Sequence, residues 1–159
     1  MSKLAVIVLG HRQSGKSTTW NVLFGRTVRT GTEIRELALT PDSSIPVFLV
    51  SGSPEERQLY VGDIISNVNP RVVLCSLQYA EGGRDSIRFF IDNGYRLFVQ
   101  WLNPGYSDEG LLPDSLGFLP YLLYNGAVVS VRDGSREPED RVDEIREYLI
   151  GWAAHRRLR

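Results

Sequence analysis

Eight residues near the start of the chain have the types and spacing of a phosphate-binding loop. Gly10 to Ser17 reads G-H-R-Q-S-G-K-S, which matches the Walker A pattern G-x-x-x-x-G-K-S. In such a loop the backbone N–H groups surround phosphate oxygens, the lysine reaches the β- and γ-phosphates, and the final hydroxyl ligates Mg²⁺. The sequence therefore predicts a site for Mg²⁺ and ATP or GTP, contacted by Gly10, His11, Arg12, Gln13, Ser14, Gly15, Lys16, Ser17 and Thr18.

Two cations of this loop are candidates for catalysis. Lys16 is expected to stabilise negative charge on the terminal phosphates, and Ser17 to hold the metal. Arg12 stands where a small residue is common. Its guanidinium can supplement Lys16 in the transition state, or it can point outward toward a partner.

Short apolar segments recur along the chain and predict strands. Five are rich in Val, Ile, Leu and Phe, as expected for strands that a parallel sheet buries on both faces. They are Leu4–Leu9, Val47–Val50, Val72–Cys75, Leu97–Val99 and Ala127–Val131, and the more alternating Ile34–Leu39 suits an edge strand. Helical patterns lie between them, at Lys16–Phe24, Glu55–Val68, Arg84–Asp92, Asp114–Tyr124 and Glu139–Ala154.

This alternation predicts an α/β, three-layer P-loop NTPase fold, with a mostly parallel sheet of about six strands and helices on both faces. We expect residues 1–159 to form one such domain. Thr40–Pro46 and Asn103–Pro113 are predicted to be irregular loops. Ligands of open α/β sheets bind at the carboxyl ends of strands, so the triphosphate should lie among the loops after Leu9, Val50, Cys75, Val99 and Val131.

The composition limits which partners and which cellular environment are expected for this protein. The formal net charge is −1, which argues against a domain whose main partner is a nucleic-acid backbone. A single cysteine, Cys75, excludes an intramolecular disulfide and favours a reducing, cytoplasmic environment. Apolar runs fall short of the roughly 20 residues that a membrane helix needs, so no membrane partner is expected.

The stretch GKSTTWNVLFGRTVRTGT resembles the opening of the translation-factor-related and small Ras-like GTPases. In that family a switch threonine closes on Mg²⁺ and the γ-phosphate, which implies Thr30 or Thr32 here, with Thr32 as the candidate second metal ligand. The resemblance also implies two switch segments, residues 26–33 and 51–60, that respond to the nucleotide and contact a protein partner.

One later motif of that family, D-x-x-G, is altered after the third predicted strand. Ser51 replaces the aspartate that anchors Mg²⁺, and Pro54 replaces the glycine that senses the γ-phosphate. Glu55 and Glu56 follow. They either orient a water molecule or simply occupy the first turn of a helix, where acidic residues are favoured.

The guanine-reading motif N-K-x-D is altered as well. Asn103 is present, but no lysine follows it and Asp108 is too far away for the spacing. Guanine specificity is therefore not supported. The remaining candidates for base contacts are Trp101 and Tyr106, by stacking, and Ser130 and Arg132, by position.

Three functions remain open from the sequence. The first is a small NTPase that acts as a switch or regulator. The second is a nucleotide or small-molecule kinase, for which Asp42, Asp63 and Asp85 are candidate acids. The third is a module that binds a nucleotide without hydrolysing it, which the substituted Ser51 and Pro54 favour.

Overall fold

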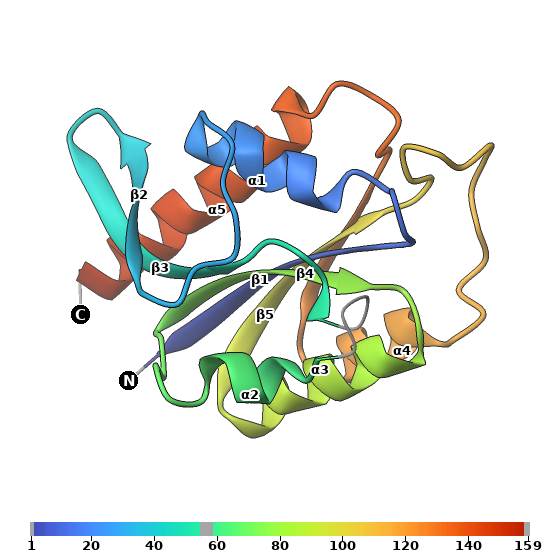
Figure 1. The fold of residues 1–159 in the computed structure, drawn as a ribbon, viewed down its shortest axis with the longest axis horizontal. Helices are drawn as coiled ribbons and strands as arrows, with labels where there is room; N and C mark the ends of the chain where they lie inside the picture. Colours follow the sequence, from blue (N-terminus) through green and yellow to red (C-terminus); the bar gives the residue numbers. More distant parts are fainter. Residues whose placement is uncertain (1, 55–58, 158–159) are drawn as a thin grey trace.

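The computed structural model describes residues 2–54 and 59–157, with side chains up to residue 154. Strands and helices alternate along the chain (Figure 1). In chain order they are β1 (Lys3–Gly10), α1 (Lys16–Phe24), β2 (Arg35–Thr40), β3 (Ser43–Val50), α2 (Val61–Ile65), β4 (Val72–Gln78), α3 (Glu81–Asp92), β5 (Tyr95–Leu102), α4 (Phe118–Tyr124), β6 (Val128–Arg132) and α5 (Glu139–Arg157).

The strands form one six-stranded sheet in the order β2-β3-β4-β1-β5-β6. Only β2 and β3 are antiparallel to each other, and the other neighbours are parallel. β1 lies between β4 and β5, with Ile7 opposite both Cys75 and Val99. The predicted α/β fold with a mostly parallel sheet is thus confirmed. The central position of β1 places the loop after Gly10 between the loops that follow β4 and β5.

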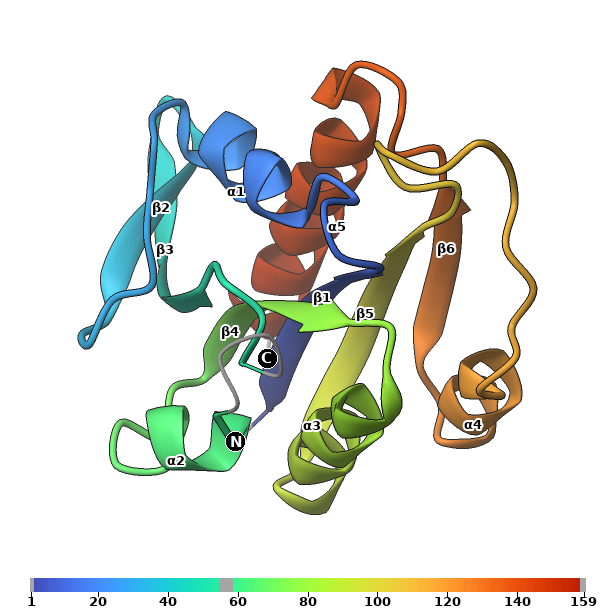
Figure 2. The ribbon, with the colours of Figure 1, turned by 45° about the vertical axis from the view of Figure 1, so that its right-hand side comes forward.

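Helices cover both faces of the sheet (Figures 1 and 2). Side chains of a strand alternate between the two faces, and β1 shows this clearly. Leu4, Val6 and Val8 pack with residues of α1 and α5, such as Trp20 and Ile145. The intervening residues of β1 pack on the opposite face with α2, α3 and α4, through the set Ala5, Ile7, Leu9, Ile65, Ile87, Phe90, Phe118 and Leu122.

Helix α1, which follows the predicted phosphate loop, is fixed at its middle and at its end. The indole Nε1 of buried Trp20 donates to Ser76 Oγ of β4 at 2.8 Å. At the C-terminus of α1, Arg146 of α5 donates to the Leu23 carbonyl at 3.0 Å. These bonds set the position of α1 relative to the sheet and to α5.

Some predicted element bounds are wrong. β3 begins at Ser43 rather than at Val47, because residues 43–46 of the predicted loop pair with β2 in a hairpin whose turn is residues 41–42. α2 spans only Val61–Ile65, and residues 55–58 of the predicted helix lie outside the described part of the chain. α4 begins at Phe118 because the Asp114 carboxylate accepts the backbone N–H groups of Phe118 and Leu119 and thereby caps the helix.

Candidate functional site

The predicted phosphate loop connects β1 to α1 in the strand–loop–helix arrangement that the Walker A pattern requires. The Lys16 side chain, only 7% exposed, folds back over this loop. Its ammonium donates to the carbonyls of His11 at 2.7 Å and Gly10 at 3.2 Å, and contacts Ser14 Oγ at 3.5 Å. The cation is therefore held at the loop that its predicted ligand would occupy.

The loops after β5 and β6 hold the phosphate loop in place at Ser14. The Ser14 carbonyl accepts the backbone N–H of Tyr106 at 3.0 Å. Gly134 donates its N–H to the Pro104 carbonyl at 2.7 Å, which joins the two outer loops to each other. A Cβ atom on Gly134 would lie 2.7 Å from the Ser14 carbonyl oxygen, and one on Gly105 would lie 2.6 Å from Ser14 Cβ. Both positions therefore require glycine for close approach.

Three pockets meet around the first turn of α1. The first pocket, about 350 Å³, lies between this turn, Tyr106 and residues 134–138. The second, about 220 Å³, lies beside Arg12, Lys16 and residues 51–53. The third, about 490 Å³, lies between α1 and residues 27–30. Ser17 lines all three, so they adjoin one another and form a groove around the start of α1.

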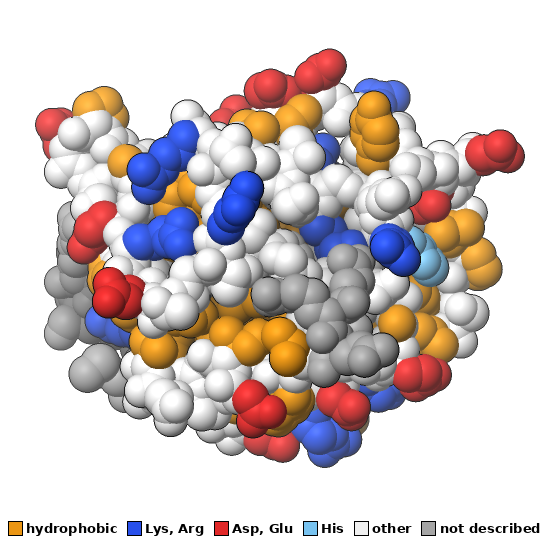
Figure 3. Space-filling view, in the orientation of Figure 1, with side chains coloured by type: hydrophobic (Ala, Val, Ile, Leu, Met, Phe, Trp, Pro, Cys, Tyr) orange, Lys and Arg blue, Asp and Glu red, His pale blue; other side chains and the backbone are white. Residues whose placement is uncertain are grey.

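The surface over this part of the molecule carries basic side chains. Figure 3 shows Lys and Arg side chains across the upper half of the face, over α1 and the segment that follows it, whereas acidic side chains lie mostly at its margins. The N-terminus of α1 adds its own partial positive charge and unpaired N–H groups. The groove therefore favours an anionic ligand.

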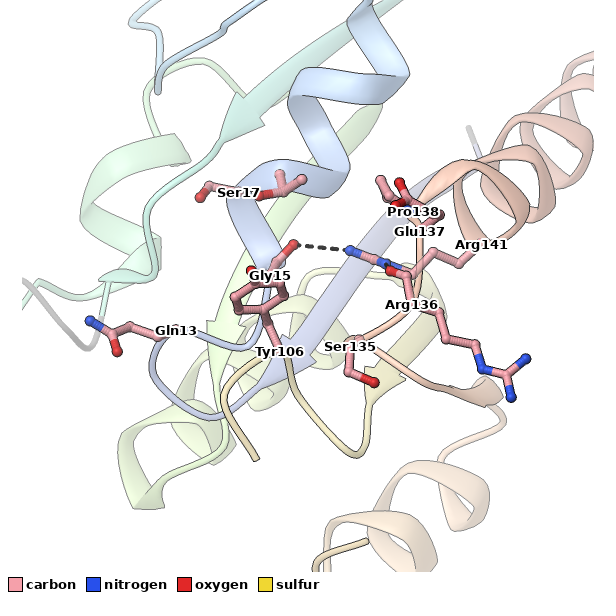
Figure 4. Close-up of a pocket in the computed structure, with 11 residues that line it drawn as sticks. Gln13, Gly15, Ser17, Tyr106, Ser135, Arg136, Glu137, Pro138 and Arg141 are labelled. Carbon is pink, nitrogen blue, oxygen red and sulfur yellow. Dashed lines mark hydrogen bonds between the residues drawn. The ribbon is translucent and has the colours of Figure 1, made fainter. Parts of the chain in front are cut away.

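Arg141 of α5 is a residue of the site that our sequence reasoning missed. Its guanidinium reaches back to the start of α1, where Nη2 donates to the Gly15 carbonyl at 3.3 Å (Figure 4). Nη2 also donates to Thr19 Oγ1 at 3.4 Å. The side chain is 4% exposed and lines the first pocket. Burial lowers the pKa of Arg141, against the opposing effect of Glu139 and Asp133. A usable signal was its spacing, four residues before buried Ile145 on α5.

Tyr106 is the exposed aromatic residue of the first pocket. It is 71% exposed and stands at the opening of the pocket, across from residues 134–138. Figure 4 shows its ring beside Gly15, while the Arg136 side chain extends away from Gly15. Tyr106 thus keeps the position that stacking on a ligand requires. The structure puts residues 134–138, which we had not singled out, in the lining.

The other predicted base contacts have structural partners elsewhere. Trp101 is buried and stacks on Tyr79 with 5.1 Å between ring centroids. Asn103 exchanges two hydrogen bonds of 2.8 Å with the backbone of Leu112, and so closes the loop that follows β5. Ser130 and Arg132 both donate to the Glu144 carboxylate. The predicted base contacts Trp101, Ser130 and Arg132 are thus engaged within the fold, as is Asn103 of the altered motif, and none of the four lines the first pocket.

The two threonines proposed for the metal lie in different surroundings. Thr30 lines the third pocket, and its Oγ1 accepts the backbone N–H groups of Ser51 at 2.9 Å and Gly52 at 3.4 Å. Thr32 is exposed and does not line the groove. Thr30 therefore links the segment after α1 to the segment after β3, the two segments predicted to act as switches.

Residues 51–53 bring hydroxyl groups to the second pocket. Ser51 and Ser53 are 6% and 1% exposed, and Ser53 Oγ has no hydrogen-bond partner among the residues that the structure describes. Glu55 and Glu56, the acids predicted next to them, lie outside the described residues. The three aspartates proposed for a kinase are exposed on the β2–β3 turn, α2 and α3, away from the lining of the groove. They are Asp42, Asp63 and Asp85.

The remaining loop residues divide between surface and interior. Arg12 is exposed and lines the second pocket beside Lys16. His11 is half-buried, its ring 5.2 Å from that of Tyr79, and its buried Nε2 has no hydrogen-bond partner within residues 2–54 and 59–157.

Within residues 2–54 and 59–157, no group of three or more His, Cys, Asp or Glu side chains is placed to hold a metal ion. None of the helices in these ranges has the length and apolar character that crossing a bilayer demands. An Mg²⁺ ion here would depend on hydroxyls, water and phosphate oxygens. Such a set suits Mg²⁺, which commonly keeps several waters and takes few protein ligands.

The fold is that of a P-loop-type α/β protein, and solved structures with it include designed proteins. A de novo designed PLOOP2X3_50 fold protein is similar, with a TM-score of 0.56, 15% identity and coverage of 96% of both chains. A second de novo designed protein has a TM-score of 0.51 and 15% identity, over 92% of this chain and 89% of its own. At this identity the likeness shows the fold alone.

No protein-family model and no curated protein matches the sequence. The resemblance to the small Ras-like and translation-factor-related GTPases is therefore wrong as a statement of family. The matching residues extend little beyond the Walker A pattern and the helix after it. The two similar structures named above are designed proteins, and a strand–loop–helix unit of this kind accounts for the similar stretch.

Proposed function

We propose that this chain binds a nucleoside triphosphate together with Mg²⁺ in the groove around the start of α1, and acts as a small NTPase with a switching or regulatory role. The observation that carries the proposal is the meeting of three pockets at Ser17, inside a Walker A loop of the right strand–loop–helix geometry. Because the three pockets adjoin at Ser17, together they would accommodate an elongated ligand whose phosphate chain lies over the loop.

The phosphate chain would lie over the loop and the N-terminus of α1. Lys16 supports this placement because its ammonium already contacts three oxygens of the loop, at Gly10, His11 and Ser14. Phosphate oxygens are stronger acceptors than backbone carbonyls, since hydrogen bonds between charged groups are shorter and stronger. A bound triphosphate would therefore draw the ammonium from these oxygens to itself.

Mg²⁺, when bound, would neutralise phosphate charge and orient the terminal phosphate. Ser17 is the residue to hold it, since its hydroxyl position is common to all three pockets. Thr30 is better placed than Thr32 to assist, because it lines the third pocket. Both lone pairs of Thr30 Oγ1 are used by Ser51 and Gly52, however, so direct contact with a metal requires these bonds to break.

Hydrolysis would depend on the residues of the second pocket. Arg12 is free to turn toward a terminal phosphate, and with Lys16 it would stabilise the charge that develops there. A module that binds without turnover is the second candidate, favoured by the neutral hydroxyls of Ser51 and Ser53 where an acid would anchor the metal. The exposed positions of Asp42, Asp63 and Asp85 give no support to a kinase.

Titration calorimetry with Mg-ATP, Mg-GTP and Mg-tripolyphosphate tests the proposal. We expect saturable binding that weakens at least about tenfold in Lys16→Ala, because a charge-assisted contact is lost. Lys3→Ala is the matched control, since Lys3 lies at the opposite end of β1 and bonds to Asn69 and Asn93. Absence of binding by all three compounds overturns the proposal. Release of phosphate then separates the NTPase from the non-hydrolysing module.

A further inference from the structure

The first pocket is lined by a buried cation, Arg141, whose charged form Glu139 and Asp133 favour at a distance. Arg141 is 4% exposed, and in the described part of the chain no carboxylate forms an ion pair with its guanidinium. Its contacts, to Gly15, Thr19 and Arg136, are neutral oxygens at 3.3–3.4 Å, the long end of the hydrogen-bond range. Its Nε is buried and has no hydrogen-bond partner in the described ranges. Buried charges are normally paired, so this one is placed to receive acceptor atoms from a ligand.

The position of Arg141 indicates which part of a nucleotide it would contact, the phosphate chain or the base. Lys16, Arg12 and residues 51–53 line the second pocket, where the end of a phosphate chain would lie. Arg141 lines the first pocket instead, with Tyr106 and residues 134–138. The exposed ring of Tyr106 offers a flat apolar face, on which nucleobases stack. The part of a nucleotide that suits the first pocket is therefore its base.

We propose that Arg141 selects nucleobases that present carbonyl oxygens, and that the protein prefers such oxo-bases to amino-bases. This rests on the nucleotide binding proposed above. A guanidinium has five donors and no acceptor. Guanine and hypoxanthine offer two adjacent acceptors, O6 and N7, that match its fork, and uracil offers O4. Adenine and cytosine place an amino donor at the corresponding edge, where it opposes the donors of Arg141.

Arg136 supplies a matched comparison within the same pocket. It also lines the first pocket, but it is exposed, and its side chain extends away from Gly15 (Figure 4). An exposed guanidinium contributes little to selectivity between ligands, because water satisfies its donors and screens its charge. Only the buried Arg141 is expected to discriminate between bases.

The experiment measures the affinities of Mg²⁺ complexes of GTP, ITP, UTP, ATP and CTP for the wild type, Arg141→Met, Arg141→Lys and Arg136→Met. We expect GTP and ITP to bind alike, at least about tenfold more tightly than ATP, and UTP more tightly than CTP. Arg141→Met should bring the preference for GTP over ATP to about twofold or less. Arg141→Lys, which keeps the charge but loses the fork, should retain part of it, and Arg136→Met all of it.

Measuring the binding of tripolyphosphate, which has no base, distinguishes failure of this proposal from failure of the nucleotide binding on which it rests. Failure of tripolyphosphate and every nucleotide to bind overturns both. Binding of the nucleotides without a preference for oxo-bases overturns only the role of Arg141. A GTP affinity far above the ITP affinity also overturns this role, since ITP lacks only the 2-amino group. The same holds if Arg141→Met weakens the binding of tripolyphosphate as much as the binding of GTP. If Arg141→Met does not fold, Arg141→Lys takes its place: a smaller ratio of GTP to ATP affinity supports the role of Arg141, and a ratio equal to that of the wild type overturns it.

Discussion

The carbonyl oxygen of Ser14 accepts the backbone N–H of Tyr106 at 3.0 Å, which ties the phosphate loop to the loop after β5. Gly134 reinforces this link from the loop after β6, through its bond to Pro104. The three loops that surround the first pocket are thus connected by backbone contacts. A substitution that moves the backbone of any of these loops should therefore also shift the phosphate loop.

Gly134→Ala should disrupt this junction. The new Cβ would lie 2.7 Å from the Ser14 carbonyl oxygen, and backbone on both sides prevents an easy shift. We expect a loss of about 1–3 kcal/mol in the free energy of unfolding, as for other overpacked sites, together with weaker nucleotide binding. Urea denaturation and calorimetry measure the two effects. Gly110→Ala is the control because a Cβ there meets no atom within 4 Å, and equal behaviour of the two variants would refute the prediction.

Asn103→Ala should loosen the loop after β5 rather than alter base selection directly. Asn103 is buried and exchanges two bonds with Leu112, so its truncation leaves a backbone donor and an acceptor without partners. The expected cost is about 1–3 kcal/mol of stability. The ratio of GTP to ATP affinity should stay unchanged in this variant. A changed ratio with unchanged stability would show instead that Asn103 contacts the base.

Thr30→Val should release the segment after β3. The substitution keeps the shape of the side chain but removes the oxygen that accepts the N–H groups of Ser51 and Gly52. We expect faster amide hydrogen exchange at these two residues, since their protection depends on this acceptor. Thr32→Val is the matched control on the same segment. Slower exchange, or an equal response to Thr32→Val, would contradict the link.

Glu144→Gln should change how stability depends on pH. Burial alone raises the pKa of Glu144, but hydrogen bonds from Gln100, Arg132 and Ser130 outweigh it and hold the pKa below its ordinary value. The unfolded chain then binds more protons than the folded one near pH 4. The stabilisation from this group is complete above the unfolded-state pKa, about 4.3, and is lost as pH falls through the lower folded-state pKa.

The variant should therefore be less stable at pH 7 and show a flatter decline in acid. Urea denaturation between pH 3 and pH 7 measures this slope. Glu147→Gln, an exposed position on the same helix, serves as the control and should leave the slope as in the wild type. An unchanged acid dependence in Glu144→Gln would mean that other carboxylates control it.

The sequence was sufficient for the phosphate loop and the sheet, because both depend on local patterns. The G-x-x-x-x-G-K-S spacing fixes the loop, and short β-branched runs separated by helical periodicity identify strands such as Leu4–Leu9. Bounds were less predictable where a single side chain decides them. Helix α4 begins at Phe118, four residues after its predicted start at Asp114. The Asp114 carboxylate caps the helix there through hydrogen bonds that periodicity does not reveal.

The site beyond the loop could not be predicted because it is made by long-range contacts. Arg141 lies 126 residues from Gly15, to which it donates. Its spacing before Ile145 indicates that it faces inward, but it does not indicate which residue it meets. Ser130 and Arg132 were chosen by position after a strand, yet Glu144 of the neighbouring helix binds them both. Polar residues near strand ends either bind a ligand or form hydrogen bonds within the fold. Their tertiary contacts, which the sequence pattern does not show, determine which of the two they do.

The attachment of α1 to α5 has a consequence for how the protein is made. Arg141 contacts the start of α1 at Gly15, and Arg146 contacts its end at Leu23, so the last helix holds both ends of the first. Synthesis proceeds from the N-terminus, and the phosphate loop leaves the ribosome long before these arginines do. The loop and the first pocket therefore reach their final form only after α5 has emerged, and a nascent chain lacking it has no complete site for a nucleotide.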